Sequence, residues 1–317
     1  MNQSRNRFLC LFFIFGLGLS AFLTQGFVPT ADAQSAPAQM VVTVEGRHGS
    51  DVPEVGRQDV MVFERRNRDQ VTNWVPAQGD NAALELVILM DDSSNFSVGT
   101  ELEELRKFME SQPASTKIAV AYMQNGIARM QQDLTADHDL AAKSLRLPQG
   151  VAGINGSPYF SLTDLVKRWP SSTARREVLM VSSGIDRYYG EENLQDPYLD
   201  AAIADAQRAG VVVYAIYTPG VGHFSHDYWQ SYWGQLYLAK LADETGGEGY
   251  YIGFQGPPVS FSPYLSDMER ALSHQYLLAF VPQPQKKNGL QPVKLTTEVP
   301  NAELVAAHKV YVLAGTR

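Results

Sequence analysis

An acidic and hydroxylated segment directly follows a short aliphatic run near residue 90. The run reads Leu-Glu-Leu-Val-Ile-Leu-Met over residues 84–90, and Asp91, Ser93 and Asn95 then alternate in a D-x-S-x-N spacing. Alternate residues of a tight loop direct their oxygens to one point, and such a cage suits a hard cation such as Mg²⁺. The same residue types also cap the first backbone N–H groups of a helix. Both interpretations stay open from the spacing alone.

The elements that position this segment alternate between strands and helices. An aliphatic run that ends in polar residues is typical of a strand buried on both faces, and open α/β sheets bind their ligands at the carboxyl edge. Further strands are expected at 117–123, 127–131, 177–181, 211–217 and 250–253, and helices at 100–110, 137–147, 156–169, 199–208, 235–245 and 264–273. This alternation predicts an α/β fold with a Rossmann-like, doubly wound and mostly parallel sheet.

Both flanks of the α/β region have β character. Strands are expected at 40–44, 59–64 and 71–74 before it, and at 275–281, 293–299 and 308–313 after it. Each flank is too small to build a core of its own, so we expect the two to pair into one small β module. The predicted organisation is a signal peptide at 1–33, an N-terminal β segment at 34–82, the α/β domain at 83–274 and a C-terminal β segment at 275–317.

The N-terminus has the parts of a secretory signal peptide. Arg5 and Arg7 precede an apolar stretch at 8–23, and Ala31-Asp32-Ala33 offers a small-x-small cleavage site. We therefore expect an exported protein, periplasmic or extracellular; an uncleaved signal that acts as an anchor is the alternative. Cys10 is the only cysteine and would leave with this segment. After cleavage no run approaches the roughly 18 apolar residues that a membrane span needs.

The charge balance narrows the class of partner. The chain carries 26 Lys and Arg against 34 Asp and Glu, a formal net charge of -8. This balance argues against a nucleic-acid groove, which needs a positive surface to neutralise phosphates. We therefore expect a protein partner or a surface polymer.

The segment from residue 84 resembles a von Willebrand factor type A (vWA) domain. That family's hallmark is an apolar strand followed by D-x-S-x-S, and residues 86–95 match it with Asn95 in place of the last serine. The likeness covers about residues 84–273. With Val41-Val42-Thr43-Val44 and Gln275-Tyr276-Leu277-Leu278 in the flanks, the chain is similar to the secreted bacterial VWFA-related domain family.

The resemblance implies a metal-ion-dependent adhesion site, in which Mg²⁺ completes its coordination with a carboxylate from a partner. Asp91 and Ser93 match the first two ligand positions, Asn95 replaces a serine and Ser157 replaces a threonine. Ser183 stands where the family has an aspartate. Because Mg²⁺ is usually held by one or two carboxylates, we expect weak or absent binding unless Asp92 or Asp186 turns toward the site. A relict site held together by hydrogen bonds is the alternative.

Aromatic residues follow two of the predicted strands. In a parallel sheet both loops leave the same edge, so these residues are expected to form a rim around Asp91 that anchors a protein partner. The alternative is that they seal this end of the core. The predicted partner-binding set is Asp92, Asp186, Tyr188, Tyr189, Phe224, Tyr228, Trp229, Tyr232 and Trp233.

The leading hypothesis is an exported, non-enzymatic binding or adhesion module. A metal-dependent hydrolase that uses His223, His226 and Asp227 is the rival, because two His residues three apart beside an Asp can hold zinc. The sequence contains no G-x-S-x-G elbow, P-loop or dinucleotide glycine signature. A third hypothesis is a structural envelope protein whose metal site is defunct.

Overall fold

The computed structural model describes residues 36–188, 195–221, 228–250 and 259–314. All of them belong to one compact unit, Ala33–Arg317. The predicted signal peptide at 1–33 lies outside the described residues. Among the helices of the described ranges, none is both long enough and apolar enough to cross a membrane.

A six-stranded sheet forms the centre of the α/β region, in the order β6-β5-β4-β7-β8-β9. The strands are β4 (Leu84–Asp91), β5 (Thr116–Gln124), β6 (Ile127–Thr135), β7 (Arg175–Ser182), β8 (Val211–Tyr217) and β9 (Gly249–Tyr250). All neighbours pair in parallel except β5 and β6. That pair is antiparallel because Asn125 and Gly126, with φ of 51° and 72°, make a two-residue turn too short for a crossover. The predicted mixed α/β fold is confirmed.

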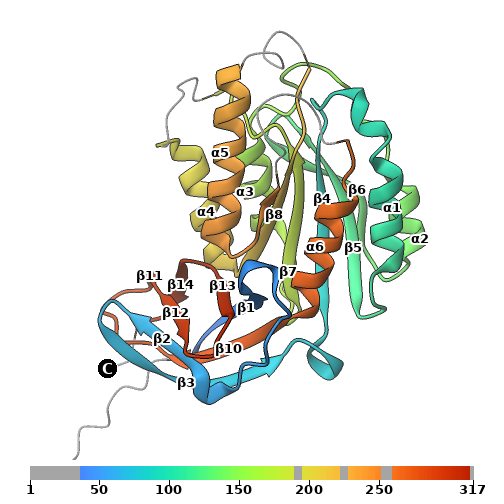
Figure 1. Cartoon of the computed structure of the whole chain (residues 1–317). Helices are drawn as coiled ribbons and strands as arrows, with labels where there is room; N and C mark the ends of the chain where they lie inside the picture. Colours follow the sequence, from blue (N-terminus) through green and yellow to red (C-terminus); the bar gives the residue numbers. More distant parts are fainter. Residues whose placement is uncertain (1–35, 189–194, 222–227, 251–258, 315–317) are drawn as a thin grey trace, which may run out of the picture. The chain divides into compact units, whose positions relative to one another are not determined.

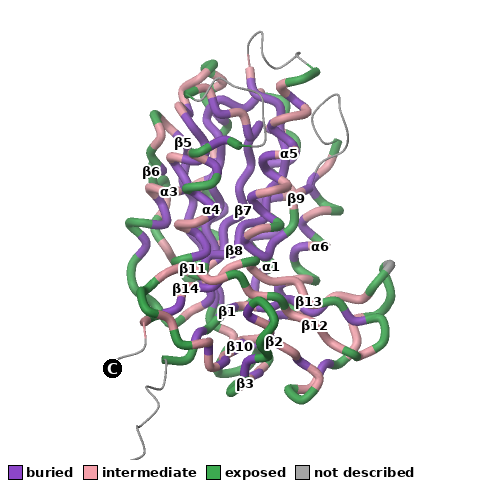
Figure 2. The backbone as a smooth tube through the Cα atoms, turned by 90° about the vertical axis from the view of Figure 1, so that its left-hand side faces the viewer, coloured by how far each residue is buried: buried purple, intermediate pink, exposed green. Residues whose placement is uncertain are grey.

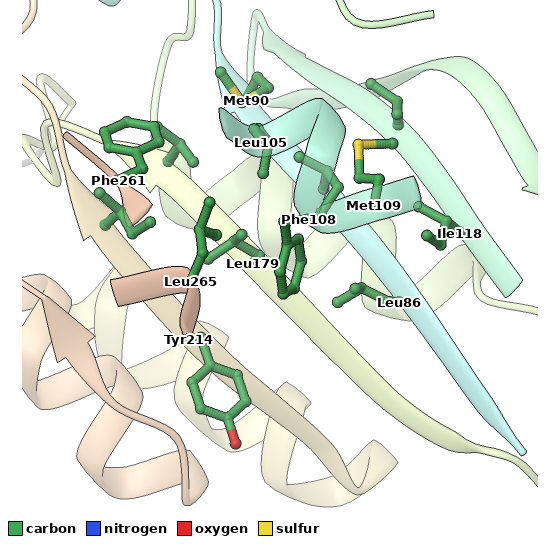
Figure 3. Close-up of a cluster of buried hydrophobic side chains, with 14 of the residues drawn as sticks. Leu86, Met90, Leu105, Phe108, Met109, Ile118, Leu179, Tyr214, Phe261 and Leu265 are labelled. Atoms are coloured by element: carbon green, nitrogen blue, oxygen red, sulfur yellow. The ribbon is translucent and has the colours of Figure 1, made fainter. Parts of the chain in front are cut away.

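Helices cover both faces of this sheet, as Figure 1 shows. One face packs against α1 (Leu102–Ser111), α2 (His138–Lys143) and α6 (Ser262–Ser273), and the other against α3 (Pro158–Arg168), α4 (Pro197–Ala209) and α5 (Tyr228–Thr245). Figure 3 shows the first of these layers, where Leu105, Phe108 and Leu265 lie over Leu86 and Leu179.

The central strand β4, like β8, consists of buried residues throughout. All eight of its residues are buried, including Asp91 at its carboxyl end, and Figure 2 shows the same burial along the neighbouring strands. A strand between two helical layers contacts apolar side chains on both faces, which explains its continuous aliphatic run. β4 therefore delivers polar residues to the sheet edge from a rigid base.

The flanking segments pair with one another into a second, six-stranded sheet in the order β12-β2-β3-β10-β1-β13. We call this sheet, with the β11-β14 pair, the β module. Its core includes Val42, Val62 and Phe280, and the Trp74 ring stacks on Tyr276 with centroids 4.4 Å apart. The strands are β1 (Ala38–Gly46), β2 (Val60–Glu64), β3 (Asn67–Pro76), β10 (Gln275–Val281), β11 (Gly289–Pro292), β12 (Lys294–Thr297), β13 (Ala302–Ala306) and β14 (Lys309–Val312).

Three predicted elements are corrected by the structure. The C-terminal flank holds five strands instead of the three that were predicted. The sequence did not indicate β11 and β13, because they are mostly half-buried and lack a continuous apolar run. The helix expected at 137–147 ends at Lys143. The helix expected at 235–245 begins at Tyr228. Its first turns therefore contain Tyr228, Trp229, Tyr232 and Trp233, which were predicted to lie in a loop.

Glu104 of α1 caps the start of α6. Its carboxylate accepts hydrogen bonds from the backbone N–H groups of Phe261 (2.6 Å) and Ser262 (2.8 Å) and from Ser260 Oγ (2.9 Å). Burial raises the pKa of Glu104, but these hydrogen bonds outweigh it and the net pKa lies below the ordinary value. The contact therefore joins two helices of the same layer.

We expect Glu104→Ala to lower the free energy of unfolding by about 1 kcal/mol, the usual effect of losing a helix cap. Because the folded pKa lies below the ordinary value, this contribution is present at neutral pH and disappears as the pH falls through the folded pKa. Urea unfolding at neutral pH and at a pH below the folded pKa measures this contribution. Glu103→Ala, on the same helix with a side chain 63% exposed, is the control and should change stability by less than about 0.5 kcal/mol.

Candidate functional site

Asp91 is the centre of the site and is fully buried. Its Oδ1 accepts hydrogen bonds from the backbone N–H (2.8 Å) and Oγ (2.7 Å) of Ser93, and its Oδ2 from Ser182 Oγ (2.8 Å) and Asn155 Nδ2 (3.1 Å). Burial raises the pKa of Asp91, and these hydrogen bonds oppose the rise without cancelling it. Three segments of the chain thus meet at one carboxyl group.

The β5–β6 turn holds Asn155 in place. Asn125 N–H donates to the carbonyl of Ile154 and Gly126 N–H to that of Asn155, both at 2.7 Å. A Cβ on Gly156 would lie 2.9 Å from the Gly126 nitrogen, so the two backbones approach closely only because residue 156 is glycine. The hairpin therefore fixes the loop that supplies Asn155 to Asp91.

The loop after β8 closes over the Ser93 segment. Asn95 N–H donates to the carbonyl of Pro219 and Val221 N–H to that of Ser93, each at 3.0 Å. Gly220 forms a β-bridge with Ser94, and a Cβ on Gly220 would lie 3.8 Å from Ser183 Oγ. Ser93 and Ser183 are therefore both covered by backbone from this loop, and both are buried.

Asn95 and Ser157 serve as helix caps. Asn95 Oδ1 accepts a hydrogen bond from Ser97 N–H (3.0 Å) at the start of the 3-10 helix Phe96–Gly99. Ser157 is the N-cap of α3 and donates to Asp186 Oδ2 at 2.6 Å. Asp186 also accepts from Tyr188 N–H at 2.7 Å. The capping interpretation of these polar residues thus has direct geometric support.

Asp92 points to a different neighbour from Asp91. Its buried carboxylate is bound on both oxygens by the Arg146 guanidinium (2.7 and 2.8 Å) and also accepts from Gln124 Nε2 (2.6 Å) and Gln149 N–H (3.0 Å). Burial raises the pKa of Asp92, but these partners outweigh it and the net pKa is lowered. Arg146 also lies 3.7 Å from the Tyr122 ring centroid. It reaches Asp92 from the non-helical segment beyond Lys143.

Asp91, Asn95 and Ser157, three of the five predicted metal positions, have their oxygens in hydrogen bonds within the protein in this arrangement. Both oxygens of Asp91 accept protein hydrogen bonds, Asn95 Oδ1 caps a helix and Ser157 is bonded to Asp186. A hard cation needs several free oxygens converging at about 2.1 Å. Across the described ranges, no group of three or more His, Cys, Asp or Glu residues could hold a metal ion. We derive no role from a metal.

The predicted aromatic rim divides into an exposed and an inner part. Tyr188 is 62% exposed, Trp229 59% and Tyr228 43%. Tyr232 and Trp233 are half-buried, and Trp233 packs against the helical core beside Tyr237. The inner part therefore follows the core-sealing alternative. Tyr189, Phe224 and the proposed zinc residues His223, His226 and Asp227 lie outside the described residues.

Three further apolar side chains at this edge were not predicted. Phe96 is 57% exposed, Val151 52% and Leu147 49%. A Cβ on Gly150 would lie 2.6 Å from the Phe96 ring, so the two loops touch. We use the name edge patch for these three residues together with Tyr188, Tyr228 and Trp229, which are exposed on segments at the same edge of the sheet. Sequence patterns miss such residues because isolated apolar side chains in loops have no periodicity.

No protein-family model and no curated protein matches the sequence. Solved structures with a similar fold include an aerotolerance-related membrane protein from Bacteroides fragilis (12% identity, 60% of this chain and 98% of that one, TM-score 0.43). They also include BatB from Bacteroides thetaiotaomicron (14%, 60% and 98%, 0.42) and the SpRpn10 VWA domain (12%, 59% and 95%, 0.35). Membership of the secreted bacterial family stays a prediction.

We expect Asp91→Ala to lower the free energy of unfolding by about 3 kcal/mol in buffer that contains a chelator. Alanine leaves the donors of Ser93, Ser182 and Asn155 without an acceptor in a buried site. Asp200→Ala, which removes a 53% exposed carboxylate bonded to Lys240, should cost less than about 1 kcal/mol. Equal stability of wild type and Asp91→Ala in chelator would contradict a structural role for Asp91.

Magnesium should leave the melting temperature of the protein unchanged. A site with a Kd of about 0.1 mM would add about 2.7 kcal/mol of stability at about 10 mM Mg²⁺. Differential scanning calorimetry with Mg²⁺, Mn²⁺ or chelator measures the effect. A rise in Tm that disappears in Asp91→Ala would show that the hydrogen-bonded arrangement opens to admit a cation.

Proposed function

We propose that the protein is an exported, non-enzymatic binding module that docks a protein partner on the edge patch without a metal ion. The observation that carries this proposal is the gathering of Phe96, Leu147, Val151, Tyr188, Tyr228 and Trp229 on loops and a helix start at the carboxyl edge of one sheet. Aromatic and aliphatic side chains exposed on a rigid base are typical of interface anchors.

The electrostatics of the site support docking through apolar contact. Asp91 is fully buried, and Asp92 is neutralised by Arg146. Both carboxylates have hydrogen-bonding partners within the protein, which supports a docking mode that needs no bridging cation. A partner would instead gain binding energy from the apolar groups that surround these paired charges.

Rigidity of the base also favours binding. The loops that carry the patch are tied to one another by the hydrogen bonds of Asn125, Gly126, Asn95 and Val221. Gln149 N–H donates to Asp92, which anchors the loop that holds Leu147 and Val151. A surface that is already ordered loses less conformational entropy when it binds.

The relict-site hypothesis is the second candidate, and the four hydrogen bonds to Asp91 favour it. In that case the protein is a structural envelope component whose edge has no partner. The two candidates differ in whether the edge patch is covered by another protein in the cell. The hydrolase hypothesis rests on residues outside the described ranges and is not developed further.

Photo-crosslinking tests the docking proposal. We expect p-benzoylphenylalanine at Phe96 or Trp229 to trap the same partner protein in intact cells, with equal yield in chelator. Leu313, which is 48% exposed beyond β14, is the matched control position and should trap none of it. With the purified partner, Phe96→Ser combined with Trp229→Ser should weaken binding at least about tenfold. Trapping from Leu313 alone, or unchanged affinity, would contradict docking at the edge patch.

A further inference from the structure

The chain passes between the β module and the α/β domain twice, and Arg175 contacts both passages. The Arg175 guanidinium donates to the carbonyl of Ala82 (3.3 Å) just before β4, and to the carbonyl of Leu272 (3.4 Å) at the end of α6. It also donates to Gln275 Oε1 at the start of β10. We call this set of contacts the seam. Arg175 is itself buried, so the seam is shielded from water.

A buried carboxyl group lies beside Arg175 without hydrogen bonds of its own. Glu177 is 0% exposed, and its Oε1 is 3.8 Å from Arg175 Nη1. Within the part of the chain that the structure describes, neither oxygen of Glu177 has a hydrogen-bond partner, and Arg175 Nε has none either. A buried charge in this position is costly unless it gains partners. The protonation state of the Glu177 carboxyl group therefore affects the guanidinium next to it.

The groups that face Glu177 from the neighbouring elements are neutral apart from Arg175. Tyr214 of β8 lies at the lower end of the apolar cluster in Figure 3, and its hydroxyl is 3.4 Å from Gln275 Nε2. Burial holds the pKa of Tyr214 well above its ordinary value, so the phenol stays neutral. Leu86 of β4 is the register neighbour of Glu177 on one side and Val212 of β8 on the other. Arg175 is thus the one charged group in this set.

We propose that Glu177 is a pH-dependent switch of the seam. Its neutral carboxyl leaves Arg175 bonded to Gln275, Ala82 and Leu272, and its carboxylate draws the guanidinium away from them. The β module is then held firmly to the α/β domain at mildly acidic pH and less firmly above neutral pH. This inference does not depend on the docking function.

The direction of the pH effect follows from the pKa. Burial raises the pKa of Glu177 from 4.5 to about 7, against the opposing effects of Arg175 and Gln275, which both favour the charged form. A carboxyl whose folded pKa is raised keeps its proton longer in the folded state, so stability is greatest below 4.5 and falls as the pH rises toward about 7. The gap between these values corresponds to a rise of roughly 300-fold in the unfolding equilibrium constant.

Hydrogen exchange of the mature protein at about pH 6 and about pH 8, corrected for intrinsic rates, tests the switch. We expect the protection factors of β10 amides to fall at least about tenfold at the higher pH, while those of β5 change less. In Glu177→Gln the fall in β10 should disappear, and denaturant unfolding between about pH 6 and about pH 8 should lose roughly tenfold of its pH dependence relative to wild type, which is the part of the roughly 300-fold total that falls in this range.

Glu85→Gln is the matched control, because Glu85 is a buried carboxyl on the neighbouring strand that accepts a hydrogen bond from Trp169 Nε1 (2.7 Å). It should keep the wild-type pH dependence in β10. If Glu177→Gln does not fold, the protection factors of the β10 amides in the wild type at the two pH values are the test of the proposal. Constant protection of β10 between the two pH values, or an undiminished fall in Glu177→Gln, overturns the proposal.

Discussion

The structure of the sheet edge depends on the cost of burying the Asp91 carboxyl group. A buried carboxylate needs hydrogen-bond donors, and here they come from Ser93 and Asn155 on two loops and from Ser182 at the end of β7. Each donor is useful only if its segment is held in place. The close approach of Gly126 to Gly156 and the bridge between Ser94 and Gly220 supply that restraint. One polar group thus organises the loops that form the candidate surface.

The need for partners in a buried site also explains why the two adjacent aspartates have different surroundings. Asp91 and Asp92 are neighbours in sequence, yet one is bound by neutral donors and the other by Arg146. The Asp91 carboxyl contacts Ser93, Ser182 and Asn155, whereas the Asp92 carboxyl contacts Arg146, Gln124 and Gln149. The pKa of Asp91 is raised and that of Asp92 is lowered for this reason. At this edge the charges are satisfied within the protein, and apolar side chains such as Phe96, Leu147 and Val151 are among the exposed groups.

The β module adds a second dependence, located at the opposite end of the sheet. Strands from both ends of the chain pair there, as β1 does with β10 and β13. Arg175 connects this module to the α/β domain through carbonyls of both passages. Two buried acids, Asp91 and Glu177, therefore occupy the two ends of the α/β domain. Asp91 has its donors, whereas Glu177 lacks them.

The sequence alone determined the α/β alternation, because buried strands such as β4 need continuous aliphatic runs and amphipathic helices such as α1 need periodic ones. It also indicated that Asp91 and Ser93 stand at the sheet edge. The partners of Asp91 were decided by tertiary structure: Asn155 and Ser182 are distant in sequence and carry no shared pattern. The roles of Arg146 and Glu177 were decided in the same way. Hydrogen bonding and burial at these positions depend on which loops and strands come together, and short-range sequence patterns do not contain that information.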